Sequence, residues 1–249
     1  MKAVLGIDVG GSGIKGVPVN LQNGHLMGHR HRLETPQPAT PNAVAETIEA
    51  LIQTFDWKGP VGCTMPSIVK EGVLKSAANI PAEWINTDAQ KLFEDRTGLP
   101  FKVLNDADAA GIGELHFGAA GGRAGTVILL TVGTGIGSAL FRDGVLIPNT
   151  EFGHLKFGPN IAEKYCGDRA RKEQKLKWEG WATRFNEYLA HLTLLFSPDV
   201  FILGGGIANK TEKYLHLLKS DTEIVIATLK NNAGIVGAAY AAHDLMSGE

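Results

Sequence analysis

The chain lacks the features that mark secreted, membrane-spanning and nucleic-acid-binding proteins. Its only cysteines are Cys63 and Cys166, too few for a disulfide framework or a zinc site and typical of a reducing compartment. No stretch approaches the roughly 18 apolar residues of a membrane span, and the first residues lack a signal-peptide pattern. The net charge of −2 and isoelectric point near 6.5 remove the simplest argument for a nucleic-acid binder. We therefore expect a cytoplasmic protein with no membrane and no nucleic-acid partner.

Glycine, in contrast, is in excess. The chain has 31 glycines in 249 residues, whereas an average usage of about 7% would give roughly 17. There is no collagen-like period, and the 44% of hydrophobic residues is enough to bury a core. The surplus glycines must therefore serve particular positions.

Many of these glycines belong to a pattern of strand, glycine loop, strand and turn that occurs twice. In the first copy an apolar run over residues 3–7 ends at Asp8, and glycines 10, 11 and 13 follow. Residues 14–19 then read as a strand, Asn23-Gly24 as a hairpin turn, and Leu26 and Met27 as the start of the return strand.

The second copy begins about 120 residues later, at roughly half the chain length. An apolar run over residues 127–130 leads to glycines 133, 135 and 137, then a strand over 139–141 and a turn at Asp143-Gly144. A single repeat at this offset predicts two related halves of an α/β protein rather than a solenoid. Between and after the copies we expect helices over residues 42–55 (started by Thr40-Pro41), 178–196 and 234–245, and buried strands over 61–65, 101–104 and 200–203.

The glycine loops do not fit the common nucleotide-binding motifs. Gly11, Gly13 and Gly16 have dinucleotide-fingerprint spacing, but Pro18 and the turn at Asn23-Gly24 predict a strand where that motif needs a helix. The P-loop sequence and the protein-kinase motifs are missing. The functional interpretation is a pair of loops whose backbone N–H groups bind phosphate; the alternative is two ordinary glycine hairpins.

In the functional interpretation, Asp8 holds Mg²⁺ through water, Ser12 and Thr134 donate to phosphate oxygens, and Lys15 supplies positive charge. The candidate phosphate-binding residues are Asp8, Gly10, Gly11, Ser12, Gly13, Lys15, Gly133, Thr134, Gly135 and Gly137.

Five blocks of the sequence, in order, resemble the signature blocks of the ROK family of sugar kinases. They are GIDVGGSGIKG, LNDADAAGIGE, LLTVGTGIGSA, NTEFGH and ILGGGI. The blocks TPQPATP, AANIPAEWINTDA, LIPNTEFGHL and NNAGIVGAA look more narrowly like the bacterial polyphosphate glucokinases of that family. The resemblance runs from about residue 4 to residue 242.

The resemblance implies a fold of two actin-like, ribonuclease H-like α/β domains around a central cleft, as in the actin–hexokinase–Hsp70 superfamily. We expect the first domain over residues 1–108 and the second over 109–249, with the helix at about 234–249 packing back on the first domain.

The resemblance also implies roles at a sugar site. Asn105-Asp106 follows a buried strand, and Asp106 is expected to act as the general base on the 6-hydroxyl of glucose; on the residues alone it could equally cap a helix. Asn105, Glu151 and His154 are expected to hold sugar hydroxyls, with Ser67 and Asn79 as secondary candidates.

Two departures from other ROK proteins carry expectations of their own. Many members have a three-cysteine zinc motif after the Gly-His pair, but here only Cys166 lies in that region. One thiolate and His154 cannot form a four-ligand structural site, so we expect no zinc. The chain also begins directly at the first strand, so the helix-turn-helix domain of ROK repressors is not expected.

The remaining question is which molecule donates the phosphoryl group. Gly204, Gly205 and Gly206 are expected to approach a nucleoside, with Gly234 and Gly237 on the same side, which suits ATP. A polyanion needs basic side chains along its path, and between residues 164 and 177 six Lys and Arg stand against two acids. The donor candidates among them are Lys164, Arg169, Arg171, Lys172, Lys175 and Lys177.

A solvated helix face of mixed charge is the alternative explanation of this basic run. We predict polyphosphate as the preferred donor, ATP as a second donor, Mg²⁺ as cofactor and a homodimer as the default assembly. The alternatives are a strictly ATP-dependent glucokinase or glucomannokinase, and a non-catalytic sugar sensor.

Overall fold

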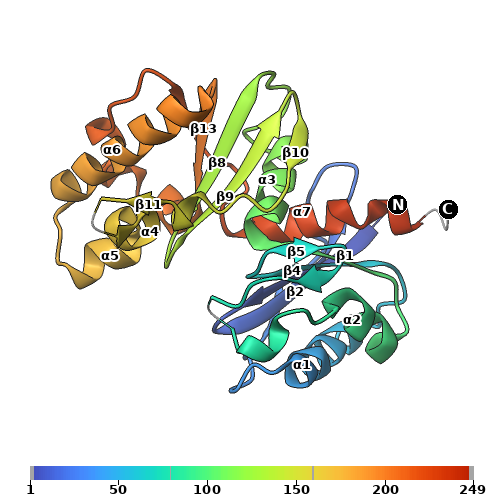
Figure 1. Ribbon diagram of the computed structural model, residues 1–249. Helices are drawn as coiled ribbons and strands as arrows, with labels where there is room; N and C mark the ends of the chain where they lie inside the picture. The colour runs from blue at the N-terminus through green and yellow to red at the C-terminus, as the bar shows by residue number, and fades with distance from the viewer. Residues whose placement is uncertain (1–2, 79, 159, 247–249) are drawn as a thin grey trace. The chain divides into compact units, whose positions relative to one another are not determined.

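The computed structural model describes residues 3–78, 80–158 and 160–246, which form two compact units (Figure 1). Unit 1 contains the chain through Phe117 and again from Asn232 onward, and unit 2 contains Gly118–Asn231. The boundary between the two units thus falls after Phe117, whereas we expected the boundary between the two domains after Asp108. The difference arises because helix α3 (Asp106–Phe117) packs along helix α7 (Ala233–Ala241) and stays with the first unit.

Unit 1 is built on a five-stranded sheet in the order β3-β2-β1-β4-β7. Strand β1 lies at its centre, antiparallel to β2 and parallel to β4, which is in turn parallel to β7. A two-stranded sheet of β5 and β6 accompanies it. The strands are β1 (Ala3–Gly10), β2 (Gly13–Asn20), β3 (His31–Leu33), β4 (Val61–Met65), β5 (Val69–Lys70), β6 (Val73–Leu74) and β7 (Phe101–Asn105).

Helices cover both faces of this sheet. On one face, α1 (Pro41–Gln53) contributes Val44, Ile48 and Leu51 to a core shared with α2 (Ala89–Thr97). The predicted start of α1 is confirmed, because the Thr40 hydroxyl accepts a hydrogen bond from the Ala43 N–H and Pro41 occupies the first turn. The helix ends at Gln53, two residues before the predicted end.

The other face of the sheet lies against α7, which contacts β1 and β4 as well as α3. Glycines make this close approach possible. A Cβ atom on Gly62 would lie 1.8 Å from the Ala238 carbonyl oxygen, and one on Gly6 would lie 2.2 Å from that of Ile235. The helix ends at Ala241 rather than at the predicted residue 245, and a 3₁₀ turn follows over His243–Met246.

Unit 2 repeats the strand order of unit 1, with a five-stranded sheet in the order β10-β9-β8-β13-β14. The central strand β8 is antiparallel to β9, which forms a hairpin with β10. On its other side β8 is parallel to β13, which is in turn parallel to β14. A two-stranded sheet of β11 and β12 lies apart from it. The strands are β8 (Thr126–Val132), β9 (Ile136–Arg142), β10 (Val145–Ile147), β11 (Lys156–Phe157), β12 (Asn160–Ile161), β13 (Val200–Gly204) and β14 (Glu223–Ile226).

The long helix α6 (Trp178–Phe196) contributes Trp181, Phe185, Leu189 and Leu192 to the core of unit 2. The short helices α4 (Ala162–Cys166) and α5 (Asp168–Glu173) precede it. Together with the repeated strand order, this confirms the predicted α/β class and the two related halves.

The return strand expected from Leu26 is interrupted. Leu26 forms an antiparallel bridge with Val19, and the regular strand β3 pairs with β2 only from His31 onward. Gly28, with φ = +112°, lies in the segment between them. In unit 2 the corresponding turn at Asp143-Gly144 has positive φ at both residues, as in tight hairpins, and β10 starts directly after it.

None of the described helices is long and apolar enough to cross a membrane.

Candidate functional site

The first predicted phosphate loop lies at the turn between β1 and β2. Gly11 and Ser12 form the turn, and β2 follows as a strand, so the expectation against a dinucleotide fold is confirmed. Side chains from β3 and the residues after it hold the turn in place: Arg32 donates to the Ser12 carbonyl oxygen, and Thr35 donates to the Gly10 carbonyl oxygen. A Cβ atom on Gly13 would meet the Arg32 guanidinium.

Asp8 lies inside β1, two residues before the strand ends, rather than at the strand end as the sequence suggested. One carboxylate oxygen accepts a hydrogen bond from the Thr64 hydroxyl at 3.0 Å, and the other lies 3.4 Å from the Lys15 ammonium. Both partners sit opposite Asp8 in the sheet register. About a quarter of the Asp8 side chain (26%) remains exposed, so this carboxylate is fixed in place and still accessible.

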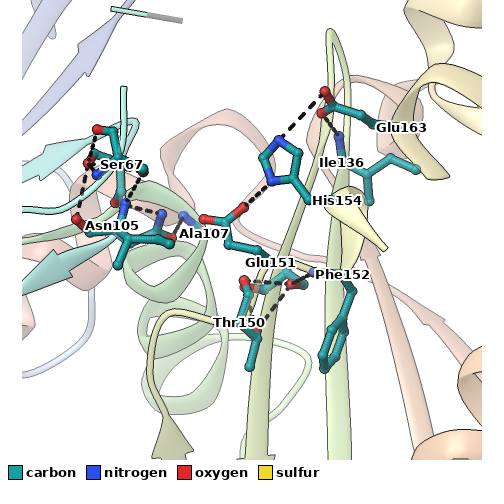
Figure 2. A network of polar contacts seen from close by, with 12 residues as sticks. Ser67, Asn105, Ala107, Ile136, Thr150, Glu151, Phe152, His154 and Glu163 are labelled. Carbon is teal, nitrogen blue, oxygen red and sulfur yellow. Dashed lines mark hydrogen bonds and ion pairs between the residues drawn. The ribbon is translucent and has the colours of Figure 1, made fainter. Parts of the chain in front are cut away.

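Asn105 and Asp106 lie where β7 passes into α3. Asn105 is buried, and its side-chain oxygen accepts hydrogen bonds from the N–H groups of Ala107 (2.8 Å) and Asp108 (3.0 Å). Its side-chain nitrogen donates to the Ser67 carbonyl oxygen at 3.0 Å (Figure 2). Asn105 is therefore the residue that caps α3.

Asp106, the first residue of α3, is exposed, and one of its carboxylate oxygens accepts from the Ala107 N–H at 2.8 Å. The cap on α3 and this bond fix the position of the carboxylate at the N-terminus of the helix. A helix N-terminus favours the charged form of an acid. The capping role that the sequence left open for Asp106 thus falls mainly to Asn105.

Ser67 and Asn79 were the secondary candidates for binding sugar. Ser67 is buried, and its hydroxyl donates within its own loop to the carbonyl oxygen of Ser76 at 2.7 Å. Its backbone oxygen, not its hydroxyl, contacts Asn105. Asn79 lies outside the described residues.

Unit 1 also contains a cavity of about 350 Å³ next to the first glycine loop. Gly10 and Gly11 form part of its wall, and most of the remaining lining is apolar or proline. The other lining residues are Val9, Thr35, Gln37, Pro38, Ala39, Val44, Met65, Pro66, Ile80, Pro81 and Trp84.

In unit 2 the second predicted phosphate loop joins β8 to β9. The Gly133 N–H donates to the Gly135 carbonyl oxygen at 2.9 Å, and Thr134 at the tip of this loop is exposed. Gly137 is already part of β9. A Cβ atom on Gly135 would lie 2.3 Å from a carboxylate oxygen of Glu163, so this glycine makes room for an acidic side chain.

Glu163 was not expected from the sequence, and it joins the loop to the two predicted sugar-binding residues of unit 2. One of its oxygens accepts from the Ile136 N–H (3.4 Å), and the other lies 3.9 Å from His154 Nε2. His154 Nδ1 lies 2.9 Å from a carboxylate oxygen of Glu151 (Figure 2). The imidazole is thus held between two carboxylates, and no short motif marks Glu163 in the sequence.

The third glycine segment, residues 204–206, lies at the end of β13. Gly205 has φ = +72°, and a Cβ atom there would lie 2.7 Å from the Val132 backbone nitrogen, so glycine is required by the close approach to β8. Gly204 ends the strand, and Gly206 is exposed in the 3₁₀ turn that follows. Gly237, which we expected on the same side, packs against Ala109 and Gly113 inside unit 1 instead.

The basic run does not form one continuous helix face. Lys164 lies in α4, Arg171 and Lys172 lie in α5, and Lys175 occupies the turn after α5 with φ = +53°. Arg169 pairs with Glu173. Arg171, Lys172 and a residue that the sequence did not suggest, Lys210, surround the carboxylate of Asp168.

The Asp168 side chain is only 4% exposed, and its oxygens lie 2.8 Å from Arg171 Nε, 3.0 Å from Lys172 Nζ and 3.2 Å from Lys210 Nζ. Burial disfavours the charged form, but the hydrogen bonds from Lys172, Arg171 and Lys210 outweigh it and lower the pKa of Asp168 to about 2.

Cys166, the one thiol near the position of the zinc motif, is buried in the core of unit 2, and burial raises its pKa. Among residues 3–78, 80–158 and 160–246, no group of three His, Cys, Asp or Glu side chains is arranged to hold a metal ion. A divalent ion held mainly by a substrate's phosphates needs no such group.

Comparisons with known proteins find relatives that are similar over most of the chain. The chain is 48% identical over 237 residues to a polyphosphate glucokinase of Mycobacterium tuberculosis (strain CDC 1551 / Oshkosh), covering 95% of this chain and 89% of the relative. It is 45% identical over 237 residues to a polyphosphate glucokinase of Mycobacterium leprae, covering 95% and 73%.

Among solved structures, the inorganic polyphosphate/ATP-glucomannokinase of Arthrobacter sp. strain KM matches with a TM-score of 0.93 and 45% identity, over 97% of this chain and 98% of that one. A ROK family glucokinase of Streptomyces griseus shares the fold, with a TM-score of 0.83 at 24% identity and coverage of 98% and 100%. The ROK family model matches residues 4–176. The chain belongs to the ROK family, as its sequence blocks suggested, and has the fold of its sugar kinases.

Proposed function

We propose that the chain is a polyphosphate glucokinase, which transfers a phosphoryl group from inorganic polyphosphate, and also from ATP, to the 6-hydroxyl of glucose. The observation that carries the proposal is the exposed carboxylate of Asp106, fixed at the start of α3 by the Asn105 cap. The similarity to proteins named polyphosphate glucokinase and polyphosphate/ATP-glucomannokinase supports the choice of substrates.

Asp106 is the proposed general base. A sugar hydroxyl is a weak nucleophile near neutral pH, and a carboxylate that orients it and accepts its proton lowers the barrier. The carboxylate must be ionised and accessible for this task. Its place at a helix N-terminus favours ionisation, and its exposure leaves it accessible.

Asn105, Glu151 and His154 are the proposed ligands of the sugar hydroxyls, and Glu163 joins them on geometric grounds. The imidazole of His154 lies between the two carboxylates, so its ring orientation is set before a sugar binds. Asn79 stays a proposed ligand from the sequence. Ser67 is better suited to positioning Asn105, since its backbone oxygen accepts from the Asn105 amide.

The two glycine loops are the proposed grip on the donor's terminal phosphates, through their backbone N–H groups and the side chains of Ser12, Lys15 and Thr134. Gly204–206 is the proposed approach to the nucleoside when ATP is the donor. Catalysis by this arrangement is mainly positioning and neutralisation of charge.

Mg²⁺ is the proposed cofactor, and the residues present fit it. Mg²⁺ takes oxygen ligands, keeps several waters and is usually bound by one or two carboxylates together with substrate phosphates. Asp8 offers one partly exposed carboxylate beside the first loop, held by Thr64 and Lys15. When bound, the ion would neutralise charge on the transferring phosphoryl group.

The substitution Asp106→Asn tests the proposal because it keeps the shape and removes the base. We expect kcat for glucose 6-phosphate formation to fall by about 10²- to 10⁴-fold, with KM for glucose changing by less than about threefold. Asp95→Asn is the matched control, since Asp95 is an exposed residue of α2 that pairs with Lys91. Near-normal turnover in Asp106→Asn would refute the role of Asp106.

Initial rates of the unaltered protein with polyphosphate and with ATP, both with Mg²⁺, test the donor. A higher kcat/KM with polyphosphate supports the proposal, and activity with ATP alone would make the chain an ATP-dependent glucokinase. Mannose belongs in the same assay, because a structure that is 45% identical is that of a glucomannokinase. Tight glucose binding without phosphoryl transfer from either donor would indicate a sensor.

We also propose a homodimer in the cytoplasm. Symmetric dimers are the commonest oligomers, and unit 2 exposes several large apolar side chains on α6 and β10, namely Leu194, Leu195, Val145 and Ile147. Both cysteines are free thiols, as is usual in a reducing compartment. Light scattering coupled to size-exclusion chromatography measures the assembly.

A further inference from the structure

One carboxylate in unit 2 is surrounded by three cations. Asp168 contacts Arg171, Lys172 and Lys210 at 2.8 to 3.2 Å. Its side chain is almost fully buried, whereas those of Lys172 and Lys210 are 61% and 32% exposed. The Arg171 side chain is only 16% exposed. A buried acid surrounded by bases that reach the solvent to different extents differs from an ordinary surface ion pair, in which both partners face water.

These cations come from two distant segments of the chain. Arg171 and Lys172 lie in α5, while Lys210 follows the 3₁₀ turn Gly205–Asn209 that begins directly after β13. The Arg169 N–H at the start of α5 donates to the Gly133 carbonyl oxygen at 3.3 Å. The cation cluster is therefore tied through the backbone to the second glycine loop, and through Lys210 to the third glycine segment.

Two of the three cations also contact an aromatic ring. The Arg171 guanidinium lies over the Trp178 ring at 4.1 Å from its centroid, and Lys210 Nζ lies 5.9 Å from the same centroid. Cation–π contacts of this kind add to the hold of the carboxylate. Both long side chains have thus given up rotational freedom before any ligand arrives, which lowers the entropy cost of binding.

The charges within the cluster do not cancel. Three cations and one carboxylate leave a net charge of +2 in a chain whose total charge is −2. Each ammonium has three N–H donors and the guanidinium has five, more than one carboxylate can accept. The three cations would repel one another without the acid between them, so Asp168 allows them to stand close together while donors remain for another anion.

We propose that Asp168 is a positioning residue that holds Arg171, Lys172 and Lys210 as a fixed array, and that this array binds phosphate groups of a linear polyphosphate chain beyond those that ATP possesses. The inference rests on the function proposed above and deepens it, because it assigns the preference for polyphosphate to particular side chains. Lys210 becomes a donor-binding residue that no motif indicated.

The substitution Asp168→Asn separates positioning from simple attraction by the sign of its effect. It removes a negative charge, so if the cluster acts only through net charge, the KM for polyphosphate falls. If Asp168 acts by holding the three cations in register, the KM for polyphosphate rises. We expect a rise of about tenfold, the equivalent of one charge-assisted hydrogen bond to phosphate, with kcat within about twofold.

Three further variants of the full-length protein complete the test. Glu173→Gln is the matched control, because it removes an acid from the same helix whose partner is Arg169 and not the cluster; its KM for polyphosphate should stay the same or fall. Asp168→Glu keeps the charge and should recover part of the loss. Lys210→Gln should raise the KM for polyphosphate as Asp168→Asn does.

Each protein is assayed with long-chain inorganic polyphosphate, with ATP and with varied glucose, and thermal unfolding verifies that each is folded at the assay temperature. We expect the KM values for ATP and glucose to change by less than about twofold. An unchanged or lower KM for polyphosphate in Asp168→Asn would overturn the inference, and so would an equal rise for ATP or no recovery in Asp168→Glu. If the unaltered protein transfers phosphate from neither donor, it is the proposed function itself that fails.

Discussion

Two glycines in α7 should respond to the same substitution with opposite signs. Gly237 lies where α7 crosses α3, and a Cβ atom there would lie 1.7 Å from the Ala109 carbonyl oxygen and 2.7 Å from the Gly113 nitrogen. Both are backbone atoms, so α3 or α7 must move as a whole to accept a methyl group. Gly234 lies one turn earlier in the same helix, and the nearest atoms to its Cβ position are 3.9 Å away, an ordinary van der Waals distance.

The free energies follow from these distances. Alanine is favoured over glycine by about 1 kcal/mol inside a helix, whereas overpacking a close contact costs about 1–3 kcal/mol. The overlap at Gly237 involves backbone at both points, so the upper end of that range applies. Gly237→Ala should therefore lower the free energy of unfolding by about 2 kcal/mol. Gly234→Ala should raise it by about 0.5 kcal/mol, because the site lies in the first turn of the helix.

Urea unfolding of the two variants and the unaltered protein measures these differences. Activity gives a second readout, because α3 begins at Asp106 and a shift of that helix moves the proposed base; Gly237→Ala should lower kcat, and Gly234→Ala should leave it within about twofold. If Gly237→Ala is as stable as the unaltered protein, or if both variants change in the same direction, the close crossing of α3 and α7 is refuted.

Other substitutions test individual side chains. Asp168→Asn should lower the free energy of unfolding by about 2 kcal/mol at pH 6, because the pKa of Asp168 lies near 2 rather than at its ordinary 3.8. Because the pKa of Asp168 is lower in the folded than in the unfolded protein, its carboxylate stabilises the folded protein fully only above the unfolded pKa. The difference in unfolding free energy between the variant and the unaltered protein should therefore shrink as the pH falls from about 4 toward 2. Urea unfolding at pH 6 and pH 3 measures this difference, and the same value at both pH values would contradict the prediction. Burial raises the pKa of both thiols, Cys63 and Cys166, so a thiol reagent at pH 8 should label them only after unfolding, and rapid labelling of the folded protein would contradict their burial. Asn105→Ala removes the α3 cap, and its unfolding in urea should show a loss of about 1 kcal/mol.

The duplicated architecture could be read from the sequence because its signals are local. A strand, a glycine loop and a returning strand occupy about twenty consecutive residues in each half, and alternation of apolar residues marks the strands. The hairpin half of each sheet, β1-β2-β3 and β8-β9-β10, repeats this local pattern. The position of β3 was less predictable, because the segment between the Leu26 bridge and His31 leaves the regular pairing and the apolar pattern of Leu26 and Met27 does not show this interruption.

The polar residues of the site likewise include some that the sequence indicates and one that it does not. Asn105 and Asp106 could be found because they adjoin a strand end and belong to a recognisable block. Glu163 could not, because its relation to His154 and to the Ile136 N–H arises only when α4 folds against the second glycine loop. In the structure its carboxylate occupies the space beside Gly135 that a side chain there would share.

The basic run shows how a count of charges can misjudge the part that one residue plays. In the sequence Asp168 only reduces the positive charge of residues 164–177, and Lys210 lies too far along the chain to be counted with them. In the structure Asp168 is the centre on which Arg171, Lys172 and Lys210 converge. Three flexible bases on a surface attract a polyanion weakly, because each must lose rotational freedom on binding. Bases held by a buried acid have already lost that freedom, so an acidic residue inside a basic run can strengthen the binding of an anion.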